Sequence, residues 1–246
     1  ILVNTCGFIE SAKTEAIENI LEACSYKQQN PELKVIVTGC LAERYRSQIE
    51  EEIPEVDAVV GCASNKAIDT IVARLFHGEN HLEIYGAKKD FPLGGKRVIG
   101  TPAHYAYLKI AEGCNNRCHY CAIPGIRGPL HSRDLADCVA EARWLAGEGV
   151  KELIVVAQDP TAYGEDWGKP GSICELLDKL NKVPGLEWIR IMYAYPERIT
   201  DDFIAAMKRN EKVVPYLDLP IQHCNDTVLK AMRRRALEQW KKDMKG

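Results

Sequence analysis

Three cysteines, Cys114, Cys118 and Cys121, are separated by only three and two residues in one short segment of the chain. Thiolates are soft ligands that suit iron–sulfur clusters or zinc, and this spacing lets all three thiols reach one small object. A cubane cluster has four irons, and a complete protein shell supplies a cysteine to each. Three cysteines leave one iron open for another ligand, so the segment predicts a reactive iron–sulfur site.

Two other interpretations of this segment remain open. The three thiols could hold zinc, with His104, His119 or His131 completing the site. The cysteines could also only pack inside the protein, although their tight spacing in a loop-like composition favours ligation.

Two further cysteines lie between the end of a predicted strand and the start of a predicted helix. They are Cys6 and Cys40. Adjacent parallel strands would bring both to one edge of a sheet, where ligands bind. A helix N-terminus also lowers the pKa of a thiol and favours the thiolate that a metal needs. Cys62 follows the third strand in the same way, but a small buried hydrophobic residue is the favoured interpretation there.

Strand and helix patterns that could position these cysteines alternate along the first third of the chain. The predicted strands are 1–5, 34–38 and 58–60, and the predicted helices are 10–26, 41–53 and 64–76. Strand followed by helix, three times over, is typical of a parallel sheet with crossover helices. We therefore expect an α/β domain over residues 1–85.

The same alternation resumes after a segment rich in Gly, Lys and Pro, residues 86–104, which we interpret as a linker. The predicted strands are 105–111, 152–158, 188–193 and 216–221, and the predicted helices are 136–148, 172–182, 201–209 and 227–235. Four β/α units are part of a (β/α) barrel, so residues 105–246 predict a partial barrel. The three-cysteine segment follows its first strand, at the end where such barrels carry their active sites.

The composition and charge of the chain limit the classes of protein to which it can belong. The chain has 246 residues, 46% of them hydrophobic, and a formal net charge of −3. With this net charge the chain is not a polycation that would attract nucleic acid. No apolar run is long enough to cross a membrane. Ten cysteines without a recognisable leader indicate metal or redox chemistry in a reducing compartment, which predicts a cytoplasmic protein.

The two ends of the sequence also carry an expectation. The chain opens on the apolar run 1–3 without an initiator Met, and it ends in a short basic stretch after Leu237. We therefore expect a protein truncated at both ends.

The motif Cys114-x3-Cys118-x2-Cys121, with the aromatic Tyr120 before the last cysteine, resembles the signature of radical S-adenosylmethionine (SAM) enzymes. The fuller stretch 107–133 is similar to the methylthiotransferase branch of that family. The resemblance implies a transferase whose first domain is a flavodoxin-like methylthiotransferase domain and whose second is a radical SAM barrel.

Cofactors follow from the resemblance. Cys114, Cys118 and Cys121 would hold a four-iron (4Fe-4S) cluster whose open iron chelates SAM, and an electron from the cluster would cleave SAM to a 5′-deoxyadenosyl radical. Tyr120 would lie against the adenine. In the family, three cysteines of the first domain hold an auxiliary 4Fe-4S cluster for sulfur delivery. Cys6 and Cys40 match the second and third of these, and the first is expected upstream of residue 1.

The substrate is indicated by segments 156–164 and 216–223. Both resemble the branch that modifies an aspartate β-carbon in the twelfth small-subunit ribosomal protein. The alternatives are an enzyme acting on transfer RNA adenosine and an iron–sulfur electron-transfer module without turnover. The family's carboxy-terminal TRAM domain is not found in this sequence, so we expect no direct nucleic-acid binding. We further expect a monomer that accepts electrons from a flavodoxin or ferredoxin.

Polar side chains near the predicted strand ends complete the candidate site. Gln158, Asp159 and Gln222 are expected to bind the cofactor, with a loop hydrogen bond as the alternative for Asp159. Arg127 and Arg133 could pair with a carboxylate of the cofactor or of the target, or lie on the surface. A basic run follows, 233–235, and we interpret it as a solvated helix end.

Overall fold

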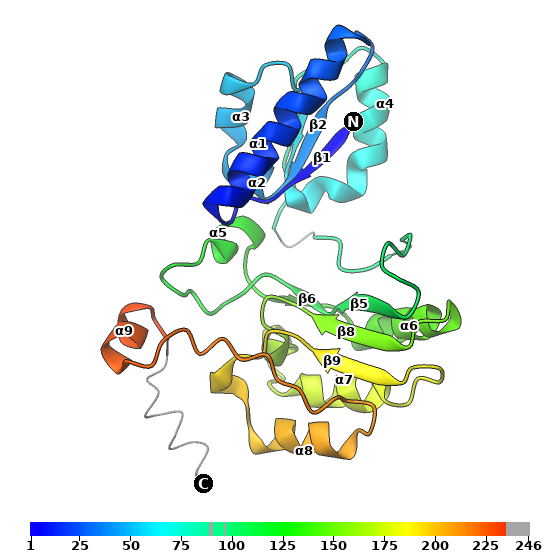
Figure 1. Cartoon of the computed structure of the whole chain (residues 1–246), viewed down its shortest axis with the longest axis vertical. Helices are drawn as coiled ribbons and strands as arrows, with labels where there is room; N and C mark the ends of the chain where they lie inside the picture. The colour runs from blue at the N-terminus through cyan, green and yellow to red at the C-terminus, as the bar shows by residue number, and fades with distance from the viewer. Residues whose placement is uncertain (89–90, 96, 235–246) are drawn as a thin grey trace. The chain divides into compact units, whose positions relative to one another are not determined.

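The computed structural model describes residues 1–88, 91–95 and 97–234 (Figure 1). The chain divides into two compact units. The first unit contains Ile1–Pro92 and Ala122–Gly128, and the second contains Leu93–Cys121 and the described residues from Pro129 onward. Both units are α/β structures, so the predicted fold class is confirmed.

The first unit is built on a parallel sheet with strand order β1-β2-β3-β4. Its strands are β1 (Leu2–Thr5), β2 (Ile36–Gly39), β3 (Ala58–Val60) and β4 (Leu82–Ile84). Its helices before the second unit are α1 (Glu10–Ser25), α2 (Cys40–Arg44), α3 (Arg46–Glu52) and α4 (Ile68–Phe76). Strand β4 was not predicted, and the predicted helix 41–53 is two helices because Tyr45 leaves helical geometry at φ −123° and ψ 31°.

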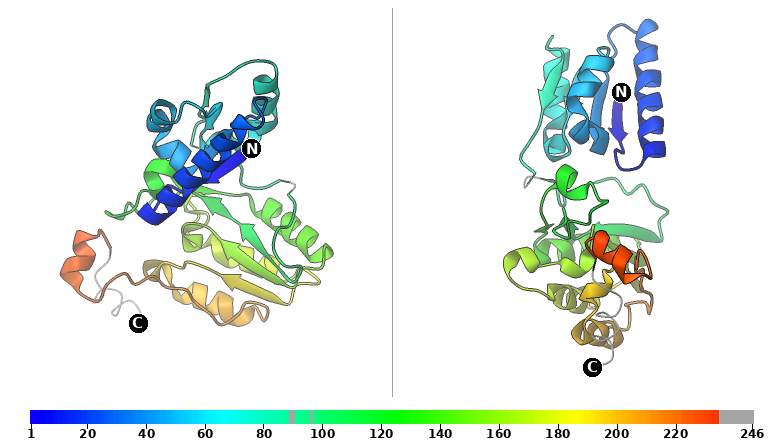
Figure 2. Two further views of the ribbon diagram at one scale, coloured as in Figure 1. Left: turned by 45° about the horizontal axis from the view of Figure 1, so that its top comes forward. Right: turned by 90° about the vertical axis from the view of Figure 1, so that its left-hand side faces the viewer.

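Alternating strand residues bury the two faces of this sheet under different helices. Val37 and Val59 pack with α1, α2 and α3, whereas Ile36 and Val60 pack with α4. This is the expected result of a side-chain period of two in strands that are covered on both faces. Figure 2 shows the helices on both sides of the sheet.

Gly39 ends β2 immediately before Cys40 and has a φ of +99°. A Cβ at this position would lie 2.3 Å from the carbonyl oxygen of Thr5. We predict that Gly39→Ala lowers the free energy of unfolding by about 3 kcal/mol, because φ +99° with ψ −166° is a backbone region that glycine alone readily occupies and because the added Cβ would clash. Gly78→Ala is the matched control, because its φ is +98° but no atom lies within 4 Å of the added Cβ.

Chemical denaturation of both glycine variants measures this difference. The control should lose only about 1 kcal/mol. Equal losses for the two variants would show that the close approach to Thr5 contributes nothing.

The second unit has a three-stranded parallel sheet, β5-β8-β9. Its strands are β5 (Tyr105–Lys109), β8 (Glu152–Val156) and β9 (Trp188–Ile191), and its longer helices are α6 (Leu135–Gly147), α7 (Ser172–Leu180) and α8 (Asp201–Arg209). Ala106 and Leu108, Leu153 and Val155, and Ile189 and Ile191 contribute to one core with these helices. An antiparallel pair, β6 (Ala111–Glu112) and β7 (His131–Ser132), extends beyond β5 on either side of the cysteine segment.

The predicted fourth barrel strand, 216–221, is wrong for this structure. The chain instead makes an isolated parallel bridge between Val213 and Ile189 of β9, and residues 216–221 adopt no strand. Pro215 precedes the segment and Pro220 lies within it, and neither can donate a ladder hydrogen bond. The helix predicted over 227–235 is α9 (Asp226–Ala231), which Asn225 caps by accepting from two backbone N–H groups; residue 235 lies outside the described part.

A helix that crosses a bilayer needs about 20 predominantly apolar residues. No helix within residues 1–88, 91–95 and 97–234 is long and apolar enough to cross a membrane.

Candidate functional site

The three predicted thiols lie on one loop of the second unit, after β6. Cys114 and Cys118 are buried, Cys121 is half-buried, and all three are free cysteines. Burial is the largest cause that raises the pKa of Cys114, and the charges of Cys118 and Cys121 add to it. Cys118 and Cys121 therefore affect the ionisation of Cys114, which lies on the same loop.

A buried carboxylate holds this loop in place. One oxygen of Asp159, which is 1% exposed, accepts hydrogen bonds from Asn116 Nδ2 at 2.8 Å and Arg198 Nη1 at 2.9 Å. The other oxygen accepts from Thr161 at 2.5 Å. Arg198 also donates to both oxygens of Glu165, at 2.7 and 3.0 Å. Since protein donors occupy both oxygens of Asp159, its observed role is to hold the loop, and a direct cofactor contact stays a prediction.

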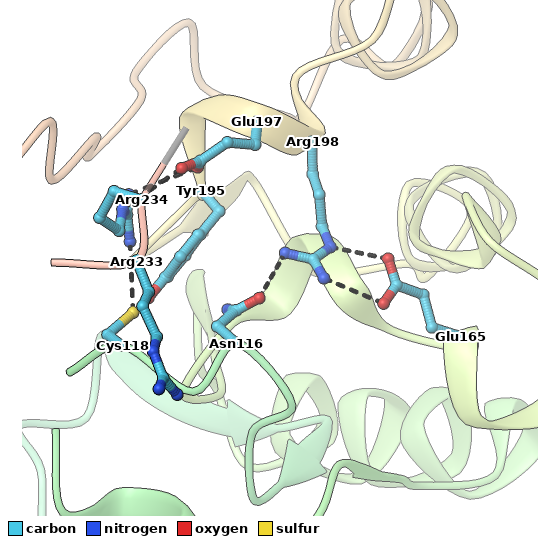
Figure 3. Close-up of a pocket in the computed structure, with 8 residues that line it drawn as sticks. All are labelled: Asn116, Cys118, Glu165, Tyr195, Glu197, Arg198, Arg233 and Arg234. Atoms are coloured by element: carbon cyan, nitrogen blue, oxygen red, sulfur yellow. Dashed lines mark hydrogen bonds and ion pairs between the residues drawn. The ribbon is translucent and has the colours of Figure 1, made fainter. Parts of the chain in front are cut away.

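Cys118 is contacted by residues from distant parts of the second unit. Tyr195 Oη lies 3.2 Å from its sulfur, and Arg234 Nη1 lies 3.9 Å from it (Figure 3). The interpretation of residues 233–235 as a solvated helix end is wrong for Arg234, which is 7% exposed. Its guanidinium carbon lies 4.0 Å from the centre of the Tyr195 ring.

A cavity of about 370 Å³ opens beside this cysteine. It is lined by Asn116, Cys118, Glu165, Tyr195, Glu197, Arg198, Arg233 and Arg234 (Figure 3). The lining is polar and carries both signs of charge, which suits a zwitterionic ligand better than an apolar one.

Two of the predicted cofactor contacts lie close to the cysteine loop. Gln158 donates from Nε2 to Glu112 at 2.8 Å, while its buried Oε1 has no hydrogen-bond partner. An unsatisfied buried acceptor next to the loop fits a ligand with an amino group. Tyr120 is half exposed, and desolvation together with Cys118 raises its pKa to about 12.

Two other predicted contacts are placed differently. The side chain of Arg133 is buried, forms an ion pair with Glu141 and donates to the carbonyl oxygen of Asp137 at 3.3 Å. Its guanidinium is thus engaged within the second unit and does not lie on the surface. Gln222 is exposed, at a φ of +64°, on the segment that does not form the predicted strand.

Two histidines that the zinc interpretation offered contact other groups. His119 Nδ1 lies 3.1 Å from the carbonyl oxygen of Ala231, and His131 lies 4.0 Å from Asp166. Over the residues that the structure describes, no group of three or more His, Cys, Asp or Glu side chains is arranged to hold a single metal ion. Three free soft thiols with a guanidinium and a hydroxyl beside one of them fit a cluster bound through thiolates.

The first unit brings its own cysteines to the carboxyl ends of neighbouring strands. Cys6 follows β1 and is exposed, Cys40 follows β2 and is half-buried, and Cys62 follows β3 and is buried. Cys62 packs with Cys40, and its pKa is raised first by the hydrogen bond with that thiol and then by burial. Arg127, from α5 (Ile123–Arg127), donates to Cys40 Sγ at 3.3 Å.

Sequence reasoning missed several residues of the site, namely Tyr195, Arg198 and Arg234. Their contacts to the cysteine loop join positions 77, 82 and 116 residues apart. The only sequence signal available was their place after predicted strands or a predicted helix, which does not identify a partner.

Two family models match the chain. The radical SAM superfamily matches residues 108–245, and "Uncharacterized protein family UPF0004" matches residues 1–77. The first match contains all three cysteines of the second-unit loop, and the second contains Cys6, Cys40 and Cys62.

Similar curated proteins bear the name "Ribosomal protein uS12 methylthiotransferase RimO". One from Acetivibrio thermocellus is 49% identical over 97% of this chain and 54% of its own length. Another, from Caldicellulosiruptor saccharolyticus, is 44% identical over 99% of this chain and 56% of its own length. The chain spans about half the length of the curated relatives it matches.

Solved structures share the fold at low identity. The radical SAM methyltransferase TsrM from Kitasatospora setae aligns with a TM-score of 0.65 and 13% identity, covering 87% of this chain and 46% of TsrM. The cobalamin-dependent SAM radical enzyme OxsB aligns with a TM-score of 0.62 and 11% identity, covering 97% of this chain and 38% of OxsB. The superfamily match over more than half of the sequence, on a fold that carries the three-cysteine loop, shows that this chain belongs to the radical SAM superfamily.

Proposed function

We propose that this chain is the catalytic part of a methylthiotransferase that modifies an aspartate β-carbon of ribosomal protein uS12. The observation that carries the proposal is the 49% identity, over 97% of the chain, to a relative named for that activity. The predicted resemblance of segments 156–164 and 216–223 to the same branch supports it. A ribosomal-protein substrate also agrees with the predicted cytoplasmic location.

Superfamily membership implies a 4Fe-4S cluster and SAM, and the second unit offers the residues for both. Cys114, Cys118 and Cys121 are the cluster ligands in this proposal. The bound cluster supplies the electron that cleaves SAM. Gln158 Oε1 would accept a hydrogen bond from the cofactor's amino group, and Tyr120 would lie against its adenine.

The remaining side chains of the second unit orient the loop. Asp159, Asn116 and Arg198 fix the backbone that carries the cysteines, so the reacting atoms are held in one geometry. Displacements of about 1 Å can cost on the order of a hundredfold in rate. These three residues therefore affect the rate by positioning the cysteine loop, and they do not contact the substrate.

An auxiliary cluster for sulfur delivery belongs to the first unit in this proposal. Cys6 and Cys40 are its ligands from this chain, and the guanidinium of Arg127 stabilises negative charge on the sulfur of Cys40. The electron donor is a small redox protein such as flavodoxin or ferredoxin. We propose that the enzyme acts as a monomer without binding nucleic acid through this part.

One anaerobic incubation tests the substrate. The reconstituted protein is mixed with SAM, a reductant, a sulfide source, uS12 and transfer RNA, and both substrates are analysed by mass spectrometry. We expect one methylthio group in place of one hydrogen on the uS12 aspartate, and unmodified transfer RNA. A methylthio-adenosine with unmodified uS12 would overturn the substrate while leaving the superfamily assignment intact.

A further inference from the structure

The sulfur of Cys118 receives more donors than the sulfurs of its two neighbours in the loop. The hydroxyl of Tyr195 is 3.2 Å away, and a guanidinium nitrogen of Arg234 is 3.9 Å away. Cys114 has a backbone contact, from the N–H of Asn116 at 3.5 Å. When the sulfur of Cys118 is a thiolate ligand it has no proton, so the hydroxyl of Tyr195 must be the donor.

Contacts with surrounding protein groups fix the hydroxyl of Tyr195 and the guanidinium of Arg234 in place. The guanidinium of Arg234 stacks on the ring of Tyr195 at 4.0 Å and donates to the carbonyl oxygen of Pro220 at 3.1 Å. Glu197 accepts from the same group at 3.4 Å. The side chain of Arg234 is only 2% exposed, so water screens its charge poorly.

Reduction adds an electron to an iron–sulfur cluster, and part of that charge is carried by its sulfurs. Hydrogen bonds and positive charge at a ligand sulfur stabilise the reduced form more than the oxidised form. The carboxylate of Glu197 offsets part of the positive charge of Arg234. The hydroxyl of Tyr195 is neutral, so Glu197 does not offset its hydrogen bond to the sulfur in the same way. From this geometry we propose that Tyr195 and Arg234 are positioning residues that raise the reduction potential of the cluster bound by the Cys118 loop. The inference rests on the proposed cluster at that loop.

Potentiometric titration of the reconstituted protein, followed by electron paramagnetic resonance, tests this role. Tyr195→Phe keeps the ring under Arg234 and removes only the hydroxyl. We expect the ratio of reduced to oxidised cluster at a fixed potential to fall about tenfold, which is about 59 mV for a one-electron couple. Arg234→Gln should shift the potential in the same direction, and Arg234→Lys, which keeps the charge, should shift it less.

The control is Tyr193→Phe, because this tyrosine is two residues away and 56% exposed. It should leave the potential unchanged. Iron and sulfide content are measured for every variant, so that a lost cluster is distinguished from a shifted one. An unchanged potential in Tyr195→Phe with full iron content, or loss of the cluster from that variant, would overturn the proposal. A parent protein that binds zinc in place of iron would overturn the proposed cluster as well.

Discussion

Alanine at Cys114, Cys118 or Cys121 is expected to abolish the cluster signal of the second unit and the cleavage of SAM. Each substitution removes one of three thiolates, so a second iron loses its protein ligand and the cluster is no longer held. Changes in groups that only support a metal ligand cost about 10–100-fold. Loss of a ligand itself should lower SAM cleavage by more than about 100-fold. Iron and sulfide content, the absorption change on adding SAM, and the yield of 5′-deoxyadenosine measure this effect.

Cys138→Ala is the matched control for these variants. Cys138 is also a buried thiol of the second unit, but it lies in α6 within the hydrophobic core. This variant should keep its cluster and its response to SAM. If Cys138→Ala lost the cluster while Cys118→Ala kept it, the assignment of the ligands would be wrong.

Asp159→Ala is expected to give the largest loss of stability among the polar residues of the site. The substitution leaves Arg198, whose side chain is 23% exposed, without one of its two carboxylate partners, and leaves Asn116 without its acceptor. Breaking a buried ion pair by removing one partner costs about 3–5 kcal/mol. Because Glu165 remains as a partner of Arg198, we expect a loss of about 3 kcal/mol in the free energy of unfolding.

Asp178→Ala provides the comparison for this measurement. Asp178 also pairs with an arginine, Arg209, at 2.7 Å, but its side chain is 36% exposed. Exposed pairs contribute about 0–1 kcal/mol, so this variant should lose much less in chemical denaturation of the cluster-free protein. Equal losses for the two variants would contradict a structural role of Asp159 in holding the loop.

The parallel sheets could be predicted because their residues follow local rules. The apolar runs that became β1, β2, β3, β5, β8 and β9 are bounded by helical patterns, as in a parallel sheet with crossover helices. In β2 and β3 alternate residues also face two buried layers. Strand β4 escaped prediction because Glu83 interrupts its apolar residues, whereas β3, of the same length, is apolar throughout. Helix α5 escaped because it contains Pro124 and Gly125 within a single short turn.

The cysteine loop could likewise be predicted, since its three thiols are neighbours in the sequence. The residues that surround Cys118 could not be predicted in the same way. Tyr195 and Arg234 reach it from positions 77 and 116 residues away, through contacts between separate loops. Such contacts depend on tertiary packing and have no fixed spacing, which is also why Arg234 was wrongly interpreted as solvated.

The origin of the abstracted hydrogen tests the central claim most directly. uS12 carrying deuterium at the β-carbon of its target aspartate is incubated anaerobically with the reconstituted protein, SAM, reductant and a sulfide source, and the 5′-deoxyadenosine is analysed by mass spectrometry. Radical attack at that carbon predicts deuterium in the 5′-deoxyadenosine. Formation of 5′-deoxyadenosine without deuterium, while uS12 stays unmodified, would contradict the claim that this site acts on the aspartate.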